Sequence, residues 1–528
     1  MKLWFVGAVG FALLVGGCST GDNSSDAAVD DVAVQGGPQA SLGTESVSPA
    51  EMVFVDCVDS TDPAVIEVVK ETAKQAGAPK AQYWDGVQCA GLQVPLDYEN
   101  PDSSKITINV SRIPATGSGG RIGSLLTNPG GPGGAGLALP LQLRAVVPPG
   151  KFDLIGFDPR GVGTSAPLYC QDDLTPMLTL APTVTDPEVN QARETVGNTV
   201  DAACQKNSTQ TYQHLGTANA ARDMDLIRQA LGDDSFNFIG FSYGTLLGTY
   251  YANLFPDKVR ALVLDGALSP TLTSRDIQTG GTQAAERGMD AFLKNCKTVK
   301  NCAFNNGSDL GKRFTKLMDK LTADPLPVSF KQGGEVQVGA AVAYRAALEG
   351  LGQGEASWVE LGEALTQADA SNGTGLAQLY AQGVGYHPDG TWDTNLEPAY
   401  FTIARASAIL SSSLSDFEDL EKFGKKMWRS VVALNVPGTY FNVPADRQTG
   451  PMPAKGAPPI LVLSATRDPS TAYEWGVELA RQLDSGVLVT RDGDGHTSML
   501  SSPDCFNIAW QYLVDPTTAP PRSTGAKC

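Results

Sequence analysis

The sequence predicts an α/β protein, in which a mostly parallel, doubly wound sheet forms the core and a helical cap is inserted between two core strands. Short apolar runs rich in β-branched and aromatic residues alternate with helical patterns up to about residue 270 and again after about residue 455. This alternation is typical of parallel sheets covered by helices on both faces. Between these two parts the strand rhythm stops and helical patterns dominate. At 528 residues the chain is also longer than one ordinary domain, which favours a core domain with a large insertion.

Composition and charge agree with a globular protein and exclude some partners. Hydrophobic residues make up 42% of the chain, which is enough to build a buried core. The formal net charge of −18 favours solubility and argues against nucleic acid or anionic lipid as a binding partner.

The first 18 residues have the pattern of an export signal. Lys2 is followed by the apolar run Leu3 to Leu14 and then by Val15-Gly16-Gly17-Cys18, which is too short for a lasting membrane span. Small residues ending on cysteine resemble a bacterial lipobox, which implies cleavage before Cys18, lipidation of its thiol and a lipid anchor on the extracytoplasmic face of the cell membrane. An ordinary secretory leader with an incidental cysteine is the alternative. Residues 19–50, rich in Gly, Ser, Asp and Ala, are expected to form a flexible tether.

Eight cysteines remain once Cys18 is set aside, and an even number in an exported protein predicts disulfide bonds. Eight cysteines allow many connectivities, but sequence proximity suggests four pairs: Cys57 with Cys89, Cys170 with Cys204, Cys296 with Cys302, and Cys505 with Cys528. A metal site is the competing explanation. We set it aside because the chain has no Cys-x-x-Cys motif and its three histidines, His214, His387 and His496, stand far apart in sequence.

The core is expected to begin at residue 51, and its first part to end at residue 270. A polar, helix-like segment covers residues 51–80, and a second helical pattern covers residues 217–231. The expected strands of this first part are 87–94, 106–112, 123–127, 152–157, 236–241 and 261–266.

Residues 271–455 are expected to form the helical cap, which would cover the site and decide its specificity. The helical patterns cover residues 278–295, 309–322, 340–369 and 397–430. The core then resumes in residues 456–528, with strands at 459–463 and 486–490.

One stretch carries the main catalytic signal. An apolar run leads into Gly240-Phe241-Ser242-Tyr243-Gly244, and helix-compatible residues follow at once. A strand, a sharp turn and a helix around Gly-x-Ser-x-Gly are typical of a nucleophile elbow, whose glycines give room for a strained turn. The Ser242 hydroxyl is then held at a helix N-terminus, where developing negative charge is stabilised. A turn serine in some other α/β protein is the plainer alternative.

The strand at 123–127 runs straight into a glycine-rich loop, Asn128–Gly136, which would bring backbone N–H groups close to a ligand. Gly131-x-Gly133-x-x-Gly136 fits a dinucleotide fingerprint, but Pro132 removes a donor and an exported protein meets little NAD. We favour an oxyanion loop, in which the N–H of Gly131 acts together with the N–H of Tyr243. No cofactor is expected.

A serine nucleophile needs a general base. His496 ends the short loop Asp492-Gly493-Asp494-Gly495-His496 after the last core strand, from which an imidazole can reach over the elbow. His214 precedes a helix ahead of the serine, and His387 lies in the cap. We therefore predict His496 as the base, with a solvated loop histidine as the alternative explanation.

The base needs an orienting acid, for which we predict Asp468, between the strand at 459–463 and a helix. Aspartate followed by proline is also a good helix N-cap, and one carboxylate can serve both roles. Asp492 and Asp494 are alternatives, but they lie so close to His496 in sequence that bonding its ring would need a strained loop. The order Ser242, Asp468, His496 is also the chain order of α/β-hydrolases.

With these residues placed, the chain resembles the exported actinobacterial tripeptidyl aminopeptidases and the related mycobacterial carboxylesterase A type of envelope serine hydrolase. The resemblance covers nearly everything after the tether. The motifs that carry it are Cys89–Tyr98, Asn128–Gly133, Asp158–Gly161, Gly240–Thr245, Asp468 and Gly495-His496, with Cys505 shortly after.

The resemblance implies an α/β-hydrolase fold and release of short peptides from free N-termini, or esterase action on acyl substrates. In such aminopeptidases acidic cap residues hold the substrate ammonium, and the candidates here are Glu349, Glu355, Glu360 and Glu363. On a helix such residues are more often a solvated face. Relatives often carry a cysteine after an Ala-Ile pair in the cap, and Ala408-Ile409-Leu410-Ser411 has none, so cap architecture carries over least safely.

We therefore expect a lipid-anchored envelope serine hydrolase that cleaves peptides through an acyl-enzyme. A carboxylesterase or lipase acting on cell-envelope acyl esters is the alternative within enzymes. A catalytically inactive binding module for peptides or glycans is the alternative outside them, and it would predict a damaged triad or elbow.

Overall fold

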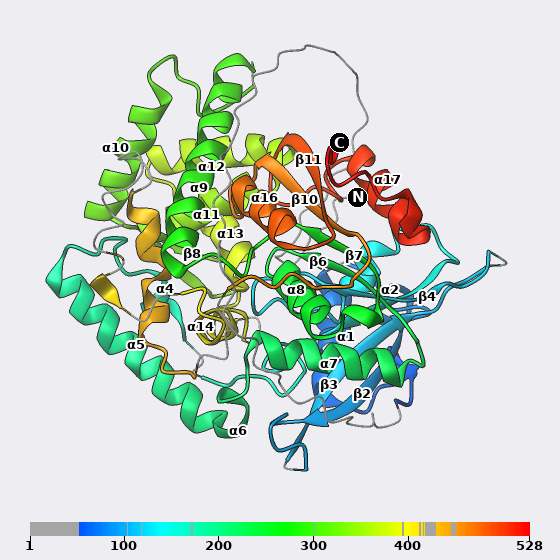
Figure 1. The fold of residues 1–528 in the computed structure, drawn as a ribbon. Coiled ribbons are helices and arrows are strands. Elements are labelled where there is room, and N and C mark those ends of the chain that lie inside the picture. Colours follow the sequence, from blue (N-terminus) through cyan, green and yellow to red (C-terminus); the bar gives the residue numbers. More distant parts are fainter. Residues whose placement is uncertain are drawn as a thin grey trace.

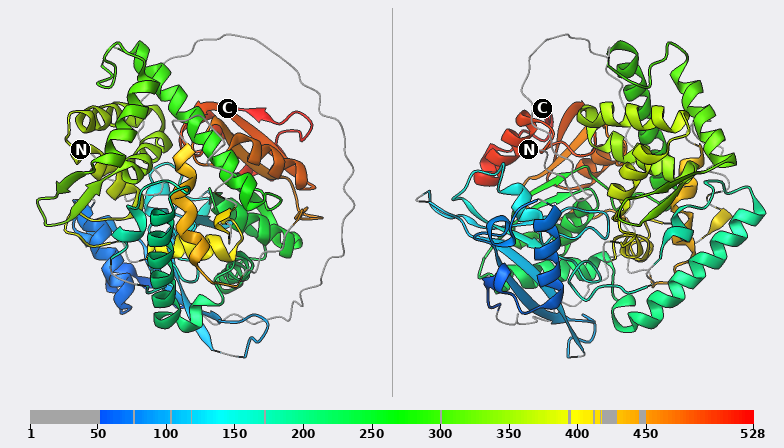
Figure 2. Two further views of the ribbon diagram at one scale, coloured as in Figure 1. Left: turned by 90° about the vertical axis from the view of Figure 1, so that its left-hand side faces the viewer. Right: turned by 180° about the vertical axis from the view of Figure 1, so that it is seen from behind.

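The computed structural model describes residues 52–528 apart from 76, 103, 118, 171–172, 300, 393–394, 411–412, 416, 418–428 and 445–449. The expected signal segment 1–18 with Cys18 and the expected tether 19–50 lie outside the described residues. Figure 1 shows a central sheet with helices packed on it and a group of helices gathered over one end. Two further views in Figure 2 show that this group lies to one side of the sheet, away from β2 and β3.

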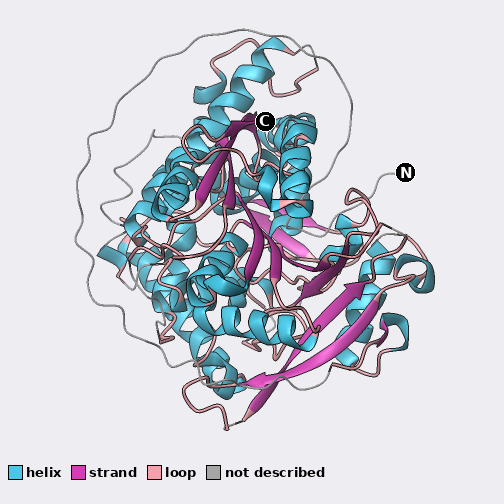
Figure 3. Ribbon diagram, turned by 45° about the vertical axis from the view of Figure 1, so that its right-hand side comes forward, coloured by secondary structure: helices cyan, strands magenta, loops and turns pink. Residues whose placement is uncertain are grey.

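Among the described residues, ten strands form one sheet in the order β1-β2-β3-β5-β4-β6-β7-β10-β11-β12. Neighbours are antiparallel from β1 to β5 and parallel from β5 to β12. Figure 3 shows the sheet as a twisted band that crosses the molecule. The strands are β1 Val55–Asp56, β2 Gln88–Pro95, β3 Lys105–Ile113, β4 Gly123–Asn128, β5 Phe152–Phe157, β6 Phe236–Phe241, β7 Val259–Asp265, β10 Ile460–Arg467, β11 Gly486–Asp494 and β12 Ala526–Lys527.

The central strands are buried on both faces, which explains their continuous apolar sequences. All six residues of β4, of β5 and of β6 are buried. Along β6, Phe238 packs into the hydrophobic cluster on one face and Ile239 into the cluster on the other face. Because successive side chains of a strand point to opposite faces of the sheet, β6 contributes to both hydrophobic clusters. The prediction of a mostly parallel sheet covered by helices is confirmed.

Helices from the core segments cover both faces of this sheet. Residues of α7, α8 and α16 belong to the larger cluster, whereas residues of α3 and α17 belong to the cluster on the opposite face. The helices outside the expected cap are α1 Pro63–Gln75, α2 Lys80–Tyr83, α3 Leu139–Leu143, α4 Thr175–Leu178, α5 Pro187–Asn207, α6 Thr209–Tyr212, α7 Thr217–Ala230, α8 Gly244–Leu254, α16 Tyr473–Gln482 and α17 Pro503–Val514.

The expected cap segment is mainly helical. Its helices are α9 Ser274–Thr298, α10 Leu310–Ala323, α11 Ala340–Gly352, α12 Trp358–Asp369, α13 Thr374–Val384, α14 Leu396–Ala406 and the 3₁₀ segment η4 Arg429–Tyr440. The helical pattern at 340–369 is interrupted by a 3₁₀ turn at Gly354–Ser357, where Gly354 has a φ of 71°. A left-handed residue cannot continue an α-helix, which is why the run divides into α11 and α12.

Two features of this region were not anticipated from sequence. A short antiparallel hairpin, β8 Leu326–Ser329 with β9 Glu335–Val338, lies between α10 and α11. The long helix α5 precedes the expected cap in sequence, yet Gly197 of α5 lies against the ring of Tyr440 in η4. The main-chain N–H of Asn442 also donates to the carboxylate of Asp201 in α5. The layer above the site is therefore built from two separate stretches of the chain.

The eight described cysteines form four disulfide bonds. The pairs are Cys57–Cys89, Cys170–Cys204, Cys296–Cys302 and Cys505–Cys528. The pairing predicted from sequence proximity is confirmed. Within the part of the chain that the structure describes, no helix has both the length and the apolar character needed to cross a membrane.

Candidate active site

Ser242 lies at a sharp turn between β6 and α8. β6 ends at Phe241 and α8 begins at Gly244, and Ser242 has a φ of 54°. A Cβ atom at Gly240 would lie 2.3 Å from the carbonyl oxygen of Gly244, so a side chain is excluded there. This strained strand–turn–helix is the nucleophile elbow that the sequence predicts. The serine N–H donates to the main-chain oxygen of Asp265 at 2.8 Å, which ties the turn to the end of β7.

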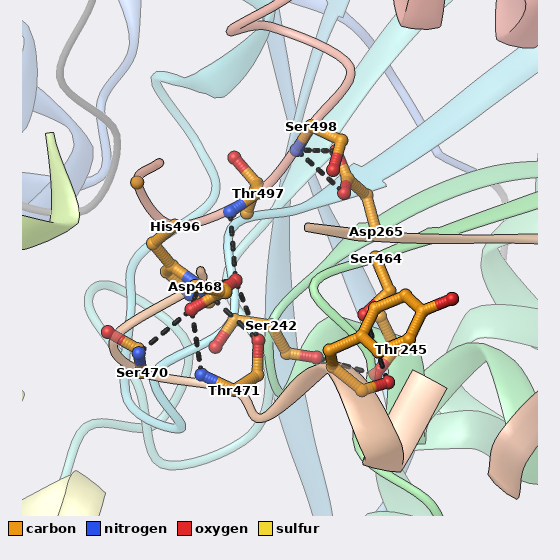
Figure 4. A network of polar contacts seen from close by, with 12 residues as sticks. Ser242, Thr245, Asp265, Ser464, Asp468, Ser470, Thr471, His496, Thr497 and Ser498 are labelled. Atoms are coloured by element: carbon orange, nitrogen blue, oxygen red, sulfur yellow. Dashed lines mark hydrogen bonds and ion pairs between the residues drawn. The ribbon is translucent and has the colours of Figure 1, made fainter. Parts of the chain in front are cut away.

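His496 and Asp468 form a buried pair next to this turn. The imidazole Nδ1 lies 2.8 Å from Oδ2 and 3.0 Å from Oδ1 of Asp468. The Asp468 side chain is 0% exposed and the His496 side chain 18%. Figure 4 shows Ser242 beside this pair, and Ser242 and His496 line the same cavity. The structure thus brings together the three residues that were predicted as nucleophile, base and acid.

Because α16 begins at Tyr473 with Ala472 as its N-cap and has no side-chain cap bond, the suggested helix-capping role of Asp468 was wrong. Its Oδ1 accepts hydrogen bonds from the N–H groups of Ser470 and Thr471, both at 2.8 Å. Its Oδ2 accepts from the hydroxyl of Thr471 and from the N–H of Thr497. These bonds hold the carboxylate in the turn between β10 and α16, where it faces the imidazole.

The two alternative acids face another partner. Asp492 and Asp494 both bind Arg467, at 2.6 Å and 2.8 Å. Both carboxylates therefore have Arg467 as their partner. The sequence argument against them, a strained loop, agrees with this placement.

The charges around the pair favour a charged imidazole and an ionised Asp468. Burial disfavours imidazolium, but the charge and hydrogen bond of Asp468, with the charges of Asp265 and Glu349, raise the pKa of His496 above its usual value. Burial also works against the carboxylate, but His496 and the donated hydrogen bonds hold the pKa of Asp468 below its usual value. The pair is thus arranged to stabilise a proton on the imidazole.

Asp265, at the end of β7, holds the segment that carries His496. Its carboxylate is completely buried and accepts from the N–H groups of Ser498 and Met499, at 2.7 to 2.9 Å. Its main-chain oxygen is the acceptor for Ser242. Burial raises the pKa of Asp265 to about 6, although the hydrogen bonds from Ser498 and Met499 act in the opposite direction. Sequence reasoning assigned this residue only to a strand, because nothing local marks a carboxylate that bonds a segment 230 positions away.

The glycine-rich loop after β4 lies directly on the elbow. A Cβ atom at Gly130 would lie 2.9 Å from the Cβ of Ser242 and 3.0 Å from the main-chain nitrogen of Tyr243. Gly131, the predicted oxyanion residue, lines the cavity together with Ser242 and His496. The N–H groups of Gly136 and Leu137 donate to the buried carboxylate of Asp158, which fixes the far end of the loop.

The cavity has a volume of about 390 Å³ and lies between the core and the cap. Its core-side lining includes Ser242, His496 and the glycine loop, and its cap-side lining comes from α9, α11, α13, α14 and η4. Many of the lining residues are apolar: Leu268, Ile277, Ala285, Leu348, Leu396, Ile409, Leu434 and Trp475. Neither His214 nor His387 is among the described residues that line it. Among the described side chains, no three His, Cys, Asp or Glu are grouped to hold a metal ion.

Only one of the four acidic cap candidates reaches this cavity. Glu349, in the last turn of α11, lines it, whereas Glu355, Glu360 and Glu363 are exposed to solvent. Glu397, which sequence reasoning did not single out, also lines the cavity and is 6% exposed. The acidic candidates Glu355, Glu360 and Glu363 were therefore wrong as cavity residues, because the 3₁₀ turn Gly354–Ser357 and α12 turn these positions outward.

Comparison with known proteins agrees with this architecture. Residues 123–305 match the family model described as alpha/beta hydrolase fold, and residues 426–528 match the one described as TAP-like protein. The chain is 29% identical to "Serine protease Hip1" of Mycobacterium tuberculosis, over 92% of this chain and 96% of that protein. It is 28% identical to "Tripeptidyl aminopeptidase" of Streptomyces lividans, over 78% of each chain.

A third relative is "Carboxylesterase B" of Mycobacterium tuberculosis, to which the chain is 31% identical over 83% of its own length and 85% of that protein. The three relatives thus include both peptidases and an esterase by name. The chain belongs to the α/β-hydrolase family, as a serine hydrolase of the tripeptidyl aminopeptidase-like group.

Proposed function

We propose that this protein is an exported serine peptidase that releases short peptides from free N-termini through an acyl-enzyme. The observation that carries the peptidase assignment is a buried carboxyl group of the cap, Glu397, in the same cavity as Ser242. The Hip1 and tripeptidyl aminopeptidase relatives support it.

The proposed chemistry follows from the arrangement of the three side chains. Ser242 attacks the scissile carbonyl, and His496 accepts its proton and returns that proton to the leaving amine. Asp468 holds the imidazole through Nδ1, so that Nε2 is the nitrogen available to the serine. Water then hydrolyses the acyl-enzyme with His496 as base. The N–H groups of Tyr243 and Gly131 are the proposed donors to the oxyanion.

Glu397 is suited to hold a substrate ammonium. Its Oε2 has no hydrogen-bond partner among the described residues, and its nearest cation is Arg345, at 3.8 Å. Burial raises the pKa of Glu397, and the charge of Arg345 offsets this only in part. A bound ammonium would supply the missing hydrogen bond and stabilise the carboxylate. Glu349 would add a second negative charge on the same side of the cavity.

Action on acyl esters of the cell envelope is the second candidate. It is favoured by the many apolar residues of the lining and by the carboxylesterase B relative. An ester substrate with no amine would leave Oε2 of Glu397 without a hydrogen bond, which is why we favour peptides.

A side-by-side assay separates the two candidates. The purified protein is given peptide amides with free or acetylated N-termini and acyl esters of increasing length, with Ser242→Ala as the blank. We expect a preference for free N-termini and a loss of that preference in Glu397→Gln. Indifference to the amine, with activity rising along the acyl series, would instead identify an esterase. Equal hydrolysis rates for wild type and Ser242→Ala would contradict both enzyme candidates and favour the inactive binding module.

We also propose that the mature protein is lipid-anchored at Cys18 on the extracytoplasmic face of the cell membrane. The support is the lipobox-like end of the leader, Val15-Gly16-Gly17-Cys18. One acyl-bearing cysteine would hold the folded domain at the surface through residues 19–50. Cys18→Ser should move the protein from the membrane fraction to the soluble fraction. Retention of this variant in the membrane fraction, at wild-type level, would contradict the anchor.

A further inference from the structure

Three cap segments place a chain of hydrogen-bonded polar side chains on the wall of the cavity. Tyr400 of α14 donates its hydroxyl proton to Oδ1 of Asn435 in η4, at 3.3 Å. Asn435 donates from Nδ2 to Oε1 of Gln278 in α9, at 2.9 Å. All three residues line the same cavity as Ser242. The chain of bonds ends at Gln278, whose side chain is 5% exposed.

The last member of this chain has an unused donor. Nε2 of Gln278 is buried and has no hydrogen-bond partner among the described residues. Its other amide atom, Oε1, already accepts from Asn435, so the group left unpaired is an N–H donor. Burial and the charge of Glu397 raise the pKa of Tyr400 to about 12, which keeps its hydroxyl protonated and able to start the chain.

An unpaired buried donor costs free energy unless a ligand supplies an acceptor. The main-chain carbonyl of a peptide is such an acceptor, whereas the methylene groups of a fatty acyl chain are not. Glu397 and Tyr400 lie three positions apart on α14 and therefore on one face of that helix. The proposed ammonium anchor and the start of the polar chain are thus neighbours, which places Gln278 near the N-terminal part of a bound peptide.

We propose that Gln278 donates a hydrogen bond from Nε2 to a main-chain carbonyl on the acyl side of the substrate, and that Asn435 and Tyr400 are positioning residues for this amide. This subsite deepens the proposed peptidase function and rests on it. It gives the enzyme a second means, besides the ammonium anchor, to select peptides over acyl chains of similar size.

The test compares two substrates that differ only in the acyl part. One is a peptidyl phenyl ester with a free N-terminus, and the other is a fatty acyl ester of the same phenol and similar length. Gln278→Met keeps the length of the side chain and removes the donor. We expect kcat/KM for the peptidyl ester to fall on the order of 10- to 100-fold, with kcat/KM for the fatty acyl ester unchanged or higher.

A second set of substrates identifies the carbonyl. Each non-scissile peptide bond is replaced in turn by an (E)-alkene, which keeps the planar shape and removes the carbonyl oxygen together with the N–H. One replacement should lower kcat/KM of the wild type by a similar factor and have little effect in Gln278→Met, because the two changes remove the same bond. Asn435→Asp should reproduce the selective loss, since a carboxylate has no proton to donate to Oε1 of Gln278.

The matched control is Thr282→Val, one turn further along α9. Thr282 also lines the cavity, but its hydroxyl donates to the main-chain oxygen of Gln278. Its removal should therefore leave the peptidyl-to-acyl ratio unchanged. The inference is overturned if Gln278→Met lowers kcat/KM for both esters alike, if it spares the peptidyl ester, or if the alkene effects are the same in both proteins. A wild type that cleaves no peptidyl substrate would instead refute the proposed function.

Discussion

The imidazole of His496 is surrounded by carboxyl groups of different origin. Asp468 binds it directly, while Asp265 at the end of β7 and Glu349 in the cap act on it through charge. The main-chain N–H of His496 donates to the main-chain oxygen of Gly352, at the end of α11. His496, the proposed base, is therefore held by the core and by the cap at once.

This environment sets the expected pH dependence. A base acts in its neutral form, so a raised pKa moves the acidic limb of kcat/KM to higher pH than the usual histidine value of about 6.5. Asp468→Asn should move the limb to lower pH and reduce kcat by roughly 10⁴-fold, because the wrong tautomer is then favoured. A pH profile of kcat/KM for both proteins checks this, and a wild-type limb clearly below 6.5 would contradict it.

Asp265 is expected to act as a positioning residue. Asp265→Asn replaces one acceptor oxygen by an NH₂ group that faces the N–H donors of Ser498 and Met499. The His496 segment should shift, so kcat should fall about tenfold or more with little change in KM. Loss of the charge should lower the pKa of His496 and move the acidic limb of the kcat/KM profile to lower pH. Ser498→Ala is the control, since its buried hydroxyl has no hydrogen-bond partner in the described structure and its N–H is kept. Equal effects of both substitutions on kcat would count against this role.

At the scale of elements, the glycine loop is the contact between β4, the elbow and the cap. A Cβ atom at Gly133 would lie 2.7 Å from the main-chain oxygen of Leu396, so the start of α14 packs directly on this loop. Asn395, just before α14, accepts from the N–H of Gly163 and donates to the oxygen of Gly161. These contacts explain how a cap helix carrying Glu397 and Tyr400 is fixed over the cavity that Ser242 lines.

Gly130 is the position where this packing should be most sensitive. Gly130→Ala would place a methyl group 2.4 Å from the main-chain oxygen of Phe241, at a φ of 94°. The loop must move away from Tyr243, and kcat should fall on the order of 10²-fold. Gly232→Ala is the matched control, because it has a positive φ of 75° and nothing within 4 Å. It should cost stability of about 1 kcal/mol and leave kcat intact, as thermal unfolding and steady-state kinetics would show.

At the scale of the whole molecule, the four disulfides tie the edges of the fold. A disulfide joins Cys505 of α17 to Cys528. It fixes the last residues of the chain next to β12, which pairs with β11. Cys57–Cys89 joins the N-terminal segment to β2, and Cys170–Cys204 joins α5 to the loop after β5. No cysteine is among the described residues that line the cavity, so the disulfide bonds are expected to affect stability more than rate.

The loop that each disulfide closes predicts the order of their contributions. Replacing the Cys296–Cys302 pair, with a sequence separation of 6, by serines should cost about 2 kcal/mol. Replacing Cys505–Cys528, with a separation of 23, should cost about 3 kcal/mol, because a longer loop restricts the unfolded chain more. Thermal unfolding of the two double variants tests this order. A larger loss of stability for the Cys296–Cys302 variant would show that native packing, and not loop length, sets the order of the two contributions.

Much of the core was predictable from sequence because its signals are local. A strand buried on both faces must be a continuous apolar run, and an elbow must have glycine where the backbone of α8 approaches Gly240. His496 was identifiable because the chain has three histidines and only this one follows a core strand. Asp468 was identifiable because it follows a core strand and because the order Ser242, Asp468, His496 is the chain order of α/β-hydrolases.

The sequence by itself thus determined the sheet from β2 to β11, the elbow, the proposed triad and the disulfide pairs, whereas the short edge strands β1 and β12 were not predicted. Tertiary structure alone decided the cavity wall: that Glu349 and Glu397 face inward while Glu355 and Glu363 face solvent, that Asp265 holds the histidine segment, and that Gln278 meets Asn435. The physical reason is that strand and turn patterns depend on neighbours in sequence. The face that a cap helix turns to the cavity depends on packing partners more than a hundred positions away, which no local pattern records.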